Sequence, residues 1–93
     1  MQENKKLELN ILQCLINEDR YNAGMAESEF LTVFHKSSYY HGEDDMFINS
    51  VIVAHCKLMK LRNYIEYGAS SNGTRVGPVL PDGYDFIEKF DCV

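Results

Sequence analysis

No run of the chain approaches the length of a membrane span, which is about 18 or more consecutive apolar residues. The polar start, MQENKKLELN, also lacks the apolar core of a signal peptide. Cysteine is scarce: Cys14, Cys56 and Cys92 form an odd set without close pairing, which is typical of reduced thiols and not of a disulfide framework. We therefore expect a cytoplasmic protein.

Basic residues are also few. The 93 residues contain nine lysines and arginines against 14 aspartates and glutamates, so the net charge is -5. Non-specific nucleic-acid binding depends on Lys and Arg that neutralise phosphates, and this balance argues against it. A phosphate-binding loop is excluded as well, because Gly68, Gly73 and Gly77 have neither the G-x-G-x-x-G order nor a following Lys-Ser or Lys-Thr.

What is present is the composition of an ordinary soluble globular protein, with 45% apolar, 12% aromatic and 25% charged residues. The length is that of one domain, so we predict a single domain over residues 1–93. A chain this small buries only about 60% of its unfolded surface, so we expect modest stability. A partner or a second copy of the chain then becomes relevant.

Apolar spacing predicts two helices in the first half of the chain. The first runs from about Lys5 to Glu18, and Asn22-Ala23-Gly24 follows it as a break. A short second helix is predicted from Glu27 to about His35, with acids in its first turn as the helix dipole prefers. The polar segment Lys36 to Gly42 has no period, so we expect a loop.

The strongest periodic signal predicts a third helix, from Asp44 to about Leu61. Its inward face is predicted to carry Ile48, Val51, Ile52, His55, Leu58 and Met59. The period then changes to two at residues 64–67, and Asn72-Gly73 favours a hairpin turn that leads to a returning strand at about 75–80. Ile65 is expected to face the core and Glu66 the solvent.

Pro78 cannot donate to a strand ladder, so it predicts that the returning strand is an edge. After the turn Pro81-Asp82-Gly83, Tyr84, Phe86, Ile87 and Phe90 predict a short C-terminal helix. The buried core is predicted to include Leu12, Leu15, Phe30, Phe34, Ile48, Ile52, Leu58, Phe86 and Ile87. The fold class is therefore α+β, with three helices, a two-stranded hairpin and a last helix.

This order resembles the winged-helix superfamily, in which the third helix is the recognition element and the hairpin is the wing. Residues 55–66, HCKLMKLRNYIE, look like the end of a recognition helix passing into a wing strand, with Asn63-Tyr64-Ile65 at the usual "gly-leu-ile" step. Residues 79–87, VLPDGYDFI, are similar to the "leu-thr-x-x-gly-x-x-phe-leu" signature of small phage- and prophage-associated winged-helix proteins. Where that signature has threonine, this chain has Leu80 or Pro81, and Asp82 is a substitute cap.

Protein docking is the first functional hypothesis, in the form of a regulatory adaptor, or an inhibitor or mimic directed at a basic nucleic-acid-binding partner. Tyrosines are enriched in protein interfaces, and acids at residues 27, 29 and 43–45 suit a basic surface. The predicted contact residues are Tyr39, Tyr40, Glu43, Asp44, Asp45, Met46, Asn49 and Val53. Packing of Tyr39 and Tyr40 over the core is the structural alternative.

The alternative function is sequence-specific DNA binding by a transcriptional regulator. The resemblance implies contacts from the third helix and the wing, through Asn49, Ser50, Val53, Lys57, Lys60, Asn72, Thr74 and Arg75, with Lys36, Ser37 and Ser38 near a phosphate. Asn49 would pair with an adenine edge and Arg75 would enter the minor groove. Acids at 43–45 oppose this, because recognition helices contact bases through their N-terminal residues.

We expect no enzymatic activity, no cofactor and no bound metal. His55 and Cys56 are adjacent, so on a helix they point about 100° apart and form no dyad. A zinc site from His35, His41 and Cys56 stays open as an alternative, although the spacing matches no recognised metal motif. An inward-facing His55 and partly buried cysteines are the commoner arrangement.

Overall fold

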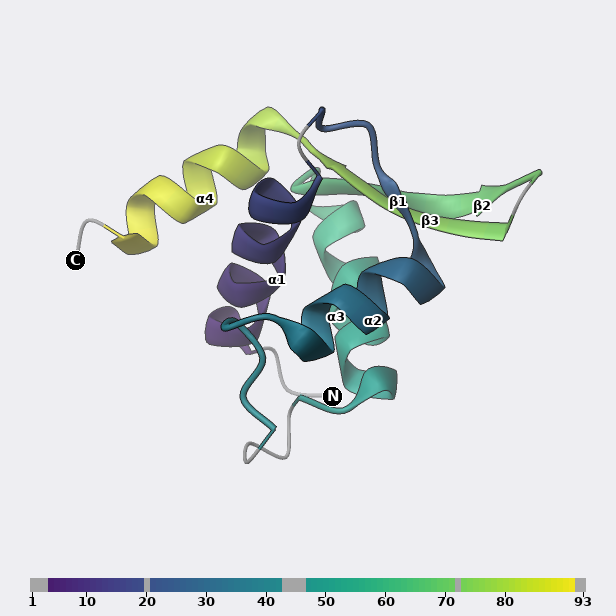
Figure 1. The fold of residues 1–93 in the computed structure, drawn as a ribbon. Coiled ribbons are helices and arrows are strands. Elements are labelled where there is room, and N and C mark those ends of the chain that lie inside the picture. The colour runs from purple at the N-terminus through teal and green to yellow at the C-terminus, as the bar shows by residue number, and fades with distance from the viewer. Residues whose placement is uncertain (1–3, 20, 43–46, 72, 92–93) are drawn as a thin grey trace.

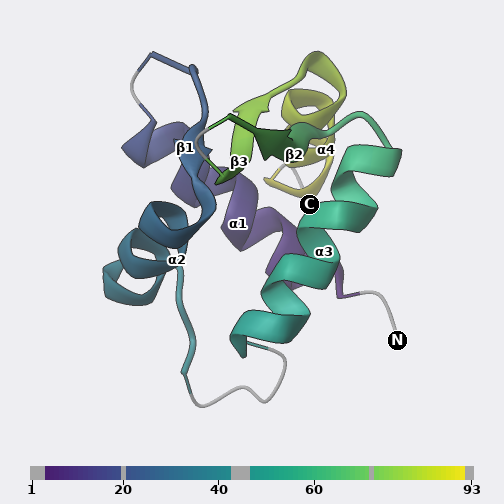
Figure 2. The same ribbon diagram turned by 90° about the vertical axis from the view of Figure 1, so that its right-hand side faces the viewer.

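The computed structural model describes residues 4–19, 21–42, 47–71 and 73–91, which form an α+β fold (Figure 1). The elements are α1 (Lys5–Glu18), β1 (Met25–Ala26), α2 (Glu27–Lys36), α3 (Asn49–Leu61), β2 (Ile65–Ser70), β3 (Gly73–Val79) and α4 (Pro81–Asp91). Helices α1, α2 and α3 surround one core, and the sheet lies across one end of it (Figures 1 and 2). Within the described ranges, no helix is both long and apolar enough to cross a membrane.

Helix α1 has the bounds that the sequence predicts. The Asn4 side-chain oxygen accepts a hydrogen bond from the Leu7 backbone N–H at 3.0 Å and so caps the first turn. His55 of α3 faces inward as expected and is fully buried. Its Nε2 accepts from the Asn4 backbone N–H at 3.0 Å, and its Nδ1 donates to the Val51 carbonyl at 2.8 Å. The ring thereby ties the start of α1 to α3.

Helix α3 begins later than predicted. It starts at Asn49 and not at Asp44, and residues 43–46 lie outside the described ranges. Ile48 is the extended residue before the helix and is 53% exposed, so its predicted place in the core is wrong. Phe47 is buried in its place, because neighbouring side chains of an extended segment point to opposite sides.

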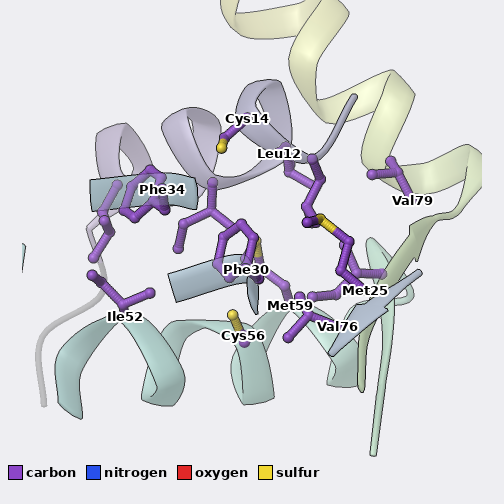
Figure 3. Close-up of a cluster of buried hydrophobic side chains, with 14 of the residues drawn as sticks. Leu12, Cys14, Met25, Phe30, Phe34, Ile52, Cys56, Met59, Val76 and Val79 are labelled. Atoms are coloured by element: carbon purple, nitrogen blue, oxygen red, sulfur yellow. The ribbon is translucent and has the colours of Figure 1, made fainter. Parts of the chain in front are cut away.

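The core lies between α1 and α3, with α2 beside them (Figure 3). The rings of Phe30 and Phe34 stack with centroids 5.6 Å apart, and Phe47 stacks on Phe34 at 6.2 Å. Leu58 and Ile87, which are predicted to be mostly buried, are half-buried, and Ile87 packs against the core. The prediction of burial is confirmed for Leu12, Leu15, Phe30, Phe34, Ile52 and Phe86.

An ion pair between a partly exposed arginine and a buried glutamate joins α1 to the end of α3. The Arg62 Nη1 atom lies 3.4 Å from the Glu8 Oε2 atom, and the Glu8 side chain is completely buried. A buried carboxylate is stable only when it is paired. The pair therefore fixes where α3 ends and β2 begins relative to α1.

The sheet contains the predicted hairpin. Strands β2 and β3 pair antiparallel, with Ile65 opposite Val79 and Ser70 opposite Gly73, and Asn72 at the turn lies outside the described residues. Ile65 is buried and Glu66 exposed, as predicted. The described sheet has a third strand that the sequence analysis missed: β1 pairs antiparallel with β3, so the strand order is β1-β3-β2.

The prediction that Pro78 marks an edge strand is wrong, because β3 is the central strand. The central position tolerates proline because β1 has only two residues and pairs with Arg75 and Val76, before Pro78 is reached. Beyond β1 the Asn22 side chain replaces a strand. Its Nδ2 donates to the Val79 carbonyl at 3.0 Å, and its Oδ1 accepts from the Val79 N–H at 2.9 Å.

Asn22 is therefore expected to support the sheet edge through its side chain. Asn22 has a φ of 50°, which glycine adopts freely and alanine does not. We expect Asn22→Gly to lower the free energy of unfolding by about 1 kcal/mol, through the two lost hydrogen bonds. Asn22→Ala should cost about 1 kcal/mol more, through backbone strain. Urea denaturation measures both, and equal stability of Asn22→Gly and the wild type would contradict the strand-like role.

Two pairs of backbone segments approach closely. Gly24, just before β1, lies against Gly77 in β3, and a Cβ atom on Gly24 would be 2.8 Å from the Gly77 carbonyl oxygen. Gly83, in the first turn of α4, lies against Tyr64, and a Cβ atom on Gly83 would overlap the Tyr64 carbonyl oxygen. The same carbonyl accepts a hydrogen bond from the Leu80 N–H at 2.9 Å. Helix α4 thus starts in direct contact with the segment that precedes β2.

Candidate interaction surfaces

The outward face of α3 is the one that the sequence predicts. Ile52, His55, Cys56 and Met59 are buried, and the opposite side of the helix faces solvent. Of the predicted contact residues on this helix, Val53 is half-buried and the others are exposed: Asn49, Ser50, Lys57 and Lys60. Leu61, which the sequence analysis did not single out, is 78% exposed at the end of the helix.

Asn49 is held by α2. Its side-chain oxygen lies 2.6 Å from the Nε2 atom of His35, which donates the hydrogen bond. The Asn49 side chain is thus oriented by a neighbour within the molecule, at the start of α3. An adenine contact from Asn49 would have to share or break this hydrogen bond.

A shallow depression of about 510 Å³ connects the end of α3 with the outer face of the sheet. Lys60 and Arg75 both line it, together with Glu66. The Arg75 guanidinium also donates to the Gly24 carbonyl at 2.9 Å, which draws it towards β1. Two cations and one anion give this depression a formal charge of +1. Thr74, on the same strand, is half-buried.

The loop after α2 packs partly on the core. Tyr40 is half-buried, with its ring 4.2 Å from that of His35 and in edge contact with Phe34 and Phe47. Ser37 is used within the loop, because its hydroxyl donates to the Phe34 carbonyl and accepts from the Tyr39 N–H. Lys36 and Ser38 are exposed. The predicted partner residues Glu43, Asp44, Asp45 and Met46 lie outside the described residues.

Glu27, the first residue of α2, has its side chain against strand β2 and not in an open acidic patch. It is half-buried, and its carboxylate accepts a hydrogen bond from the Tyr67 hydroxyl. Burial raises the pKa of the Tyr67 phenol above its usual range, and the Glu27 carboxylate adds to this. The other predicted acid of α2, Glu29, is exposed.

A second groove, which the sequence analysis did not predict, lies between α1 and α4. It has a volume of about 380 Å³ and is lined by Gln13, Ile16, Asn17, Tyr39 and Ile87. Ile16 is 39% exposed there, whereas the other large apolar side chains of α1 are buried or, for Leu9, half-buried. Tyr39, one of the predicted partner residues, therefore faces a groove formed by residues far from it in sequence. We call this the α1–α4 groove.

A row of aromatic rings holds α4 beside the groove. Phe86 contacts Tyr64 at a centroid distance of 4.9 Å and Phe90 at 4.7 Å. The Lys5 ammonium group lies 5.7 Å from the Phe90 centroid, over the ring. Helix α4 extends from the end of β3 past α1 and away from the other helices (Figure 1). Part of its apolar surface is left open, because Tyr84 and Phe90 are exposed.

The described cysteines and histidines have side chains of the kind that a metal site requires. Cys14 and Cys56 are free thiols in the core; burial raises the pKa of Cys14 to about 11 and that of Cys56 to about 12. Cys92 lies outside the described residues. In the part of the chain that the structure describes, no group of three His, Cys, Asp or Glu side chains is placed to hold a metal. The alternative zinc site is therefore not formed: Cys56 is buried, whereas His35 is exposed.

Family models, curated proteins and solved structures were compared with this chain, and none of them matches it. The geometry of the two surfaces therefore carries the functional argument.

Proposed function

We propose that this chain is a cytoplasmic winged-helix domain that acts without catalysis, as a protein-docking adaptor or inhibitor for a partner with a basic surface. The order α1-β1-α2-α3-β2-β3 and the strand order β1-β3-β2 support the winged-helix assignment. The hairpin extends beyond the helices, as a wing does (Figure 1). The net charge of -5 supports a basic partner.

The exposure of large apolar side chains carries the docking proposal. A contiguous exposed apolar surface marks an interaction site, whereas apolar residues that are exposed singly do not. In the described residues, Ile16 on α1 and Tyr84 and Phe90 on α4 are exposed. The α1–α4 groove brings Ile16 together with the half-buried Tyr39 and Ile87, which gives an apolar contact area with a defined shape.

DNA binding is the second candidate, because Lys60 and Arg75 line the same depression and Lys57 is exposed on the same helix. The positive charge of the depression is too small to favour DNA binding over protein docking. Proteins that hold duplex DNA make on the order of 6 to 10 phosphate contacts. Here Glu66 offsets one of the cations that line the depression.

The two functions are separated by titrating the protein against a labelled duplex DNA and a labelled basic amphipathic peptide. The peptide consists of Lys and Leu, with Leu at helical spacing. We expect micromolar binding of the peptide and no DNA binding at moderate salt. Lys57→Glu with Lys60→Glu should leave peptide affinity unchanged or raise it. Lys6→Glu with Lys89→Glu is the control, because both lysines are exposed and the charge change is the same.

Salt-sensitive DNA binding that is lost in the Lys57 and Lys60 double variant, but kept in the Lys6 and Lys89 variant, would overturn protein docking in favour of DNA binding. Failure of the peptide to bind would also count against docking of a basic partner. Circular dichroism of each variant confirms that the helices are retained.

A further inference from the structure

We infer that the α1–α4 groove is the docking site for a partner helix that presents an apolar face flanked by Lys or Arg. This inference rests on the proposed function and assigns its site. Amphipathic helices commonly dock by laying their apolar face into such a groove. The groove has a volume of about 380 Å³ and is open to solvent.

The apolar surface of α4 is incomplete within the molecule. Phe86 is buried against Tyr64, but Ile87 is half-buried and Tyr84 and Phe90 are exposed. Tyr84, Ile87 and Phe90 follow one another at spacings of three residues, so they lie along one side of the helix. Helix α4 packs chiefly on α1, and it extends away from the other helices (Figure 1). A partner helix would complete this burial.

The charges beside the groove determine the kind of partner. The side chains that line it are uncharged. At its rim the Glu18 carboxylate accepts a hydrogen bond from the Asn17 amide at 3.2 Å, and Glu88, exposed, follows Ile87 on α4. Lys5 is at the other end of α1, over the Phe90 ring. A partner with Lys or Arg beside its apolar face meets opposite charge here, whereas a second copy of this groove would bring the same acids.

The mapping experiment uses the Lys and Leu peptide on the uniformly ¹⁵N-labelled protein. We expect the amide shifts that move to centre on residues 13, 16, 17, 39 and 87, which line the groove. Ile16→Ser should weaken binding at least about fivefold, as expected for a central apolar contact. Ile48→Ser is the matched control, because Ile48 is an exposed isoleucine away from the groove. A peptide with Ser in place of Leu should not bind.

Charge is tested with Glu18→Lys and Glu88→Lys together, against Glu29→Lys with Glu66→Lys as a control of equal charge change at exposed acids elsewhere. The first pair should weaken the peptide complex more than the second, and the difference should shrink at high salt. Equal weakening by both pairs would show a general charge effect and overturn the site.

Two further outcomes would overturn the inference. If the peptide binds but shifts the amides of α3 or the hairpin, the groove is the wrong site although docking of a basic partner still holds. If sedimentation shows a dimer that Ile16→Ser dissociates, the occupant is a second copy of this chain, and the inference of a basic partner is overturned.

Discussion

Gly83→Ala is expected to lower the free energy of unfolding by about 3 kcal/mol, at the upper end for an overpacked site. A Cβ atom at this position would overlap the Tyr64 carbonyl oxygen and lie 2.9 Å from the Val79 Cγ1 atom. The first of these contacts is with backbone, so no side-chain rotation relieves it. The Leu80 N–H also bonds the same carbonyl, so relief requires α4 to move away from the start of the hairpin.

Gly68→Ala is the matched control. Gly68 lies in β2, and a Cβ atom there would meet nothing within 4 Å. Alanine restricts the unfolded chain more than glycine does, so this variant should be as stable as the wild type or slightly more stable. Urea denaturation followed by circular dichroism measures both. A Gly83→Ala variant within about 1 kcal/mol of Gly68→Ala would show that α4 is not packed as described.

Ile52→Ala is expected to destabilise the protein by about 2 to 5 kcal/mol, because it leaves a cavity in a close-packed core. Ile52 is fully buried on α3, on the side of the core where Phe34 lies (Figure 3). The surrounding helices cannot collapse into the space, since the Glu8–Arg62 pair and the His55 hydrogen bonds fix α3 against α1.

Ile48→Ala makes the same chemical change four residues earlier, at a side chain that is 53% exposed. We expect a loss of less than about 1 kcal/mol there, as for most surface substitutions. The comparison tests the position at which α3 begins. A large loss of unfolding free energy at residue 48 with a small one at residue 52 would mean that Ile48 is buried and Ile52 exposed. Helix α3 would then begin earlier than described.

The elements that carry their own periodic signal were predictable from the sequence. Helix α1 has an apolar repeat over its whole length and a capping Asn4, and its bounds match the prediction. The hairpin was predictable as well, because the period changes to two after residue 63 and Asn72-Gly73 specifies the turn. In both cases the information is local, within a few residues of the element itself.

The sequence-based predictions fail where residues far away in the sequence determine the local structure. Strand β1 has only two residues, too few for a period, and it forms because Met25 pairs with Val76 and Ala26 with Arg75 of β3, far along the chain. The same pairing explains why Pro78 wrongly predicted an edge strand. Strand β1 pairs with one part of β3, and the Asn22 side chain bonds Val79 in another part. Ile48 fits the helical period, but the chain before Asn49 is extended and buries Phe47 instead.

One of the two candidate surfaces was predictable from the sequence, and the other was not. The outward face of α3 follows from a helical wheel, so its exposed lysines and Asn49 were placed correctly. The α1–α4 groove needs α4 to cross α1 and the loop after α2 to supply Tyr39. In the sequence Ile16 fits the apolar repeat of α1 like its neighbours, so only the packing shows that it is 39% exposed.

The contact between Gly24 and Gly77 limits how this protein can diverge. The two residues are brought together only by the pairing of β1 with β3, and each occupies a positive φ of 89° or 86°. A side chain at Gly24 would meet the Gly77 carbonyl oxygen at 2.8 Å, and one at Gly77 would enter a space bounded by Gly24, Asp19 and Leu15. Descendants of this sequence could therefore replace the exposed residues of α3 and the groove, and so acquire new partners, while inheriting these two glycines together.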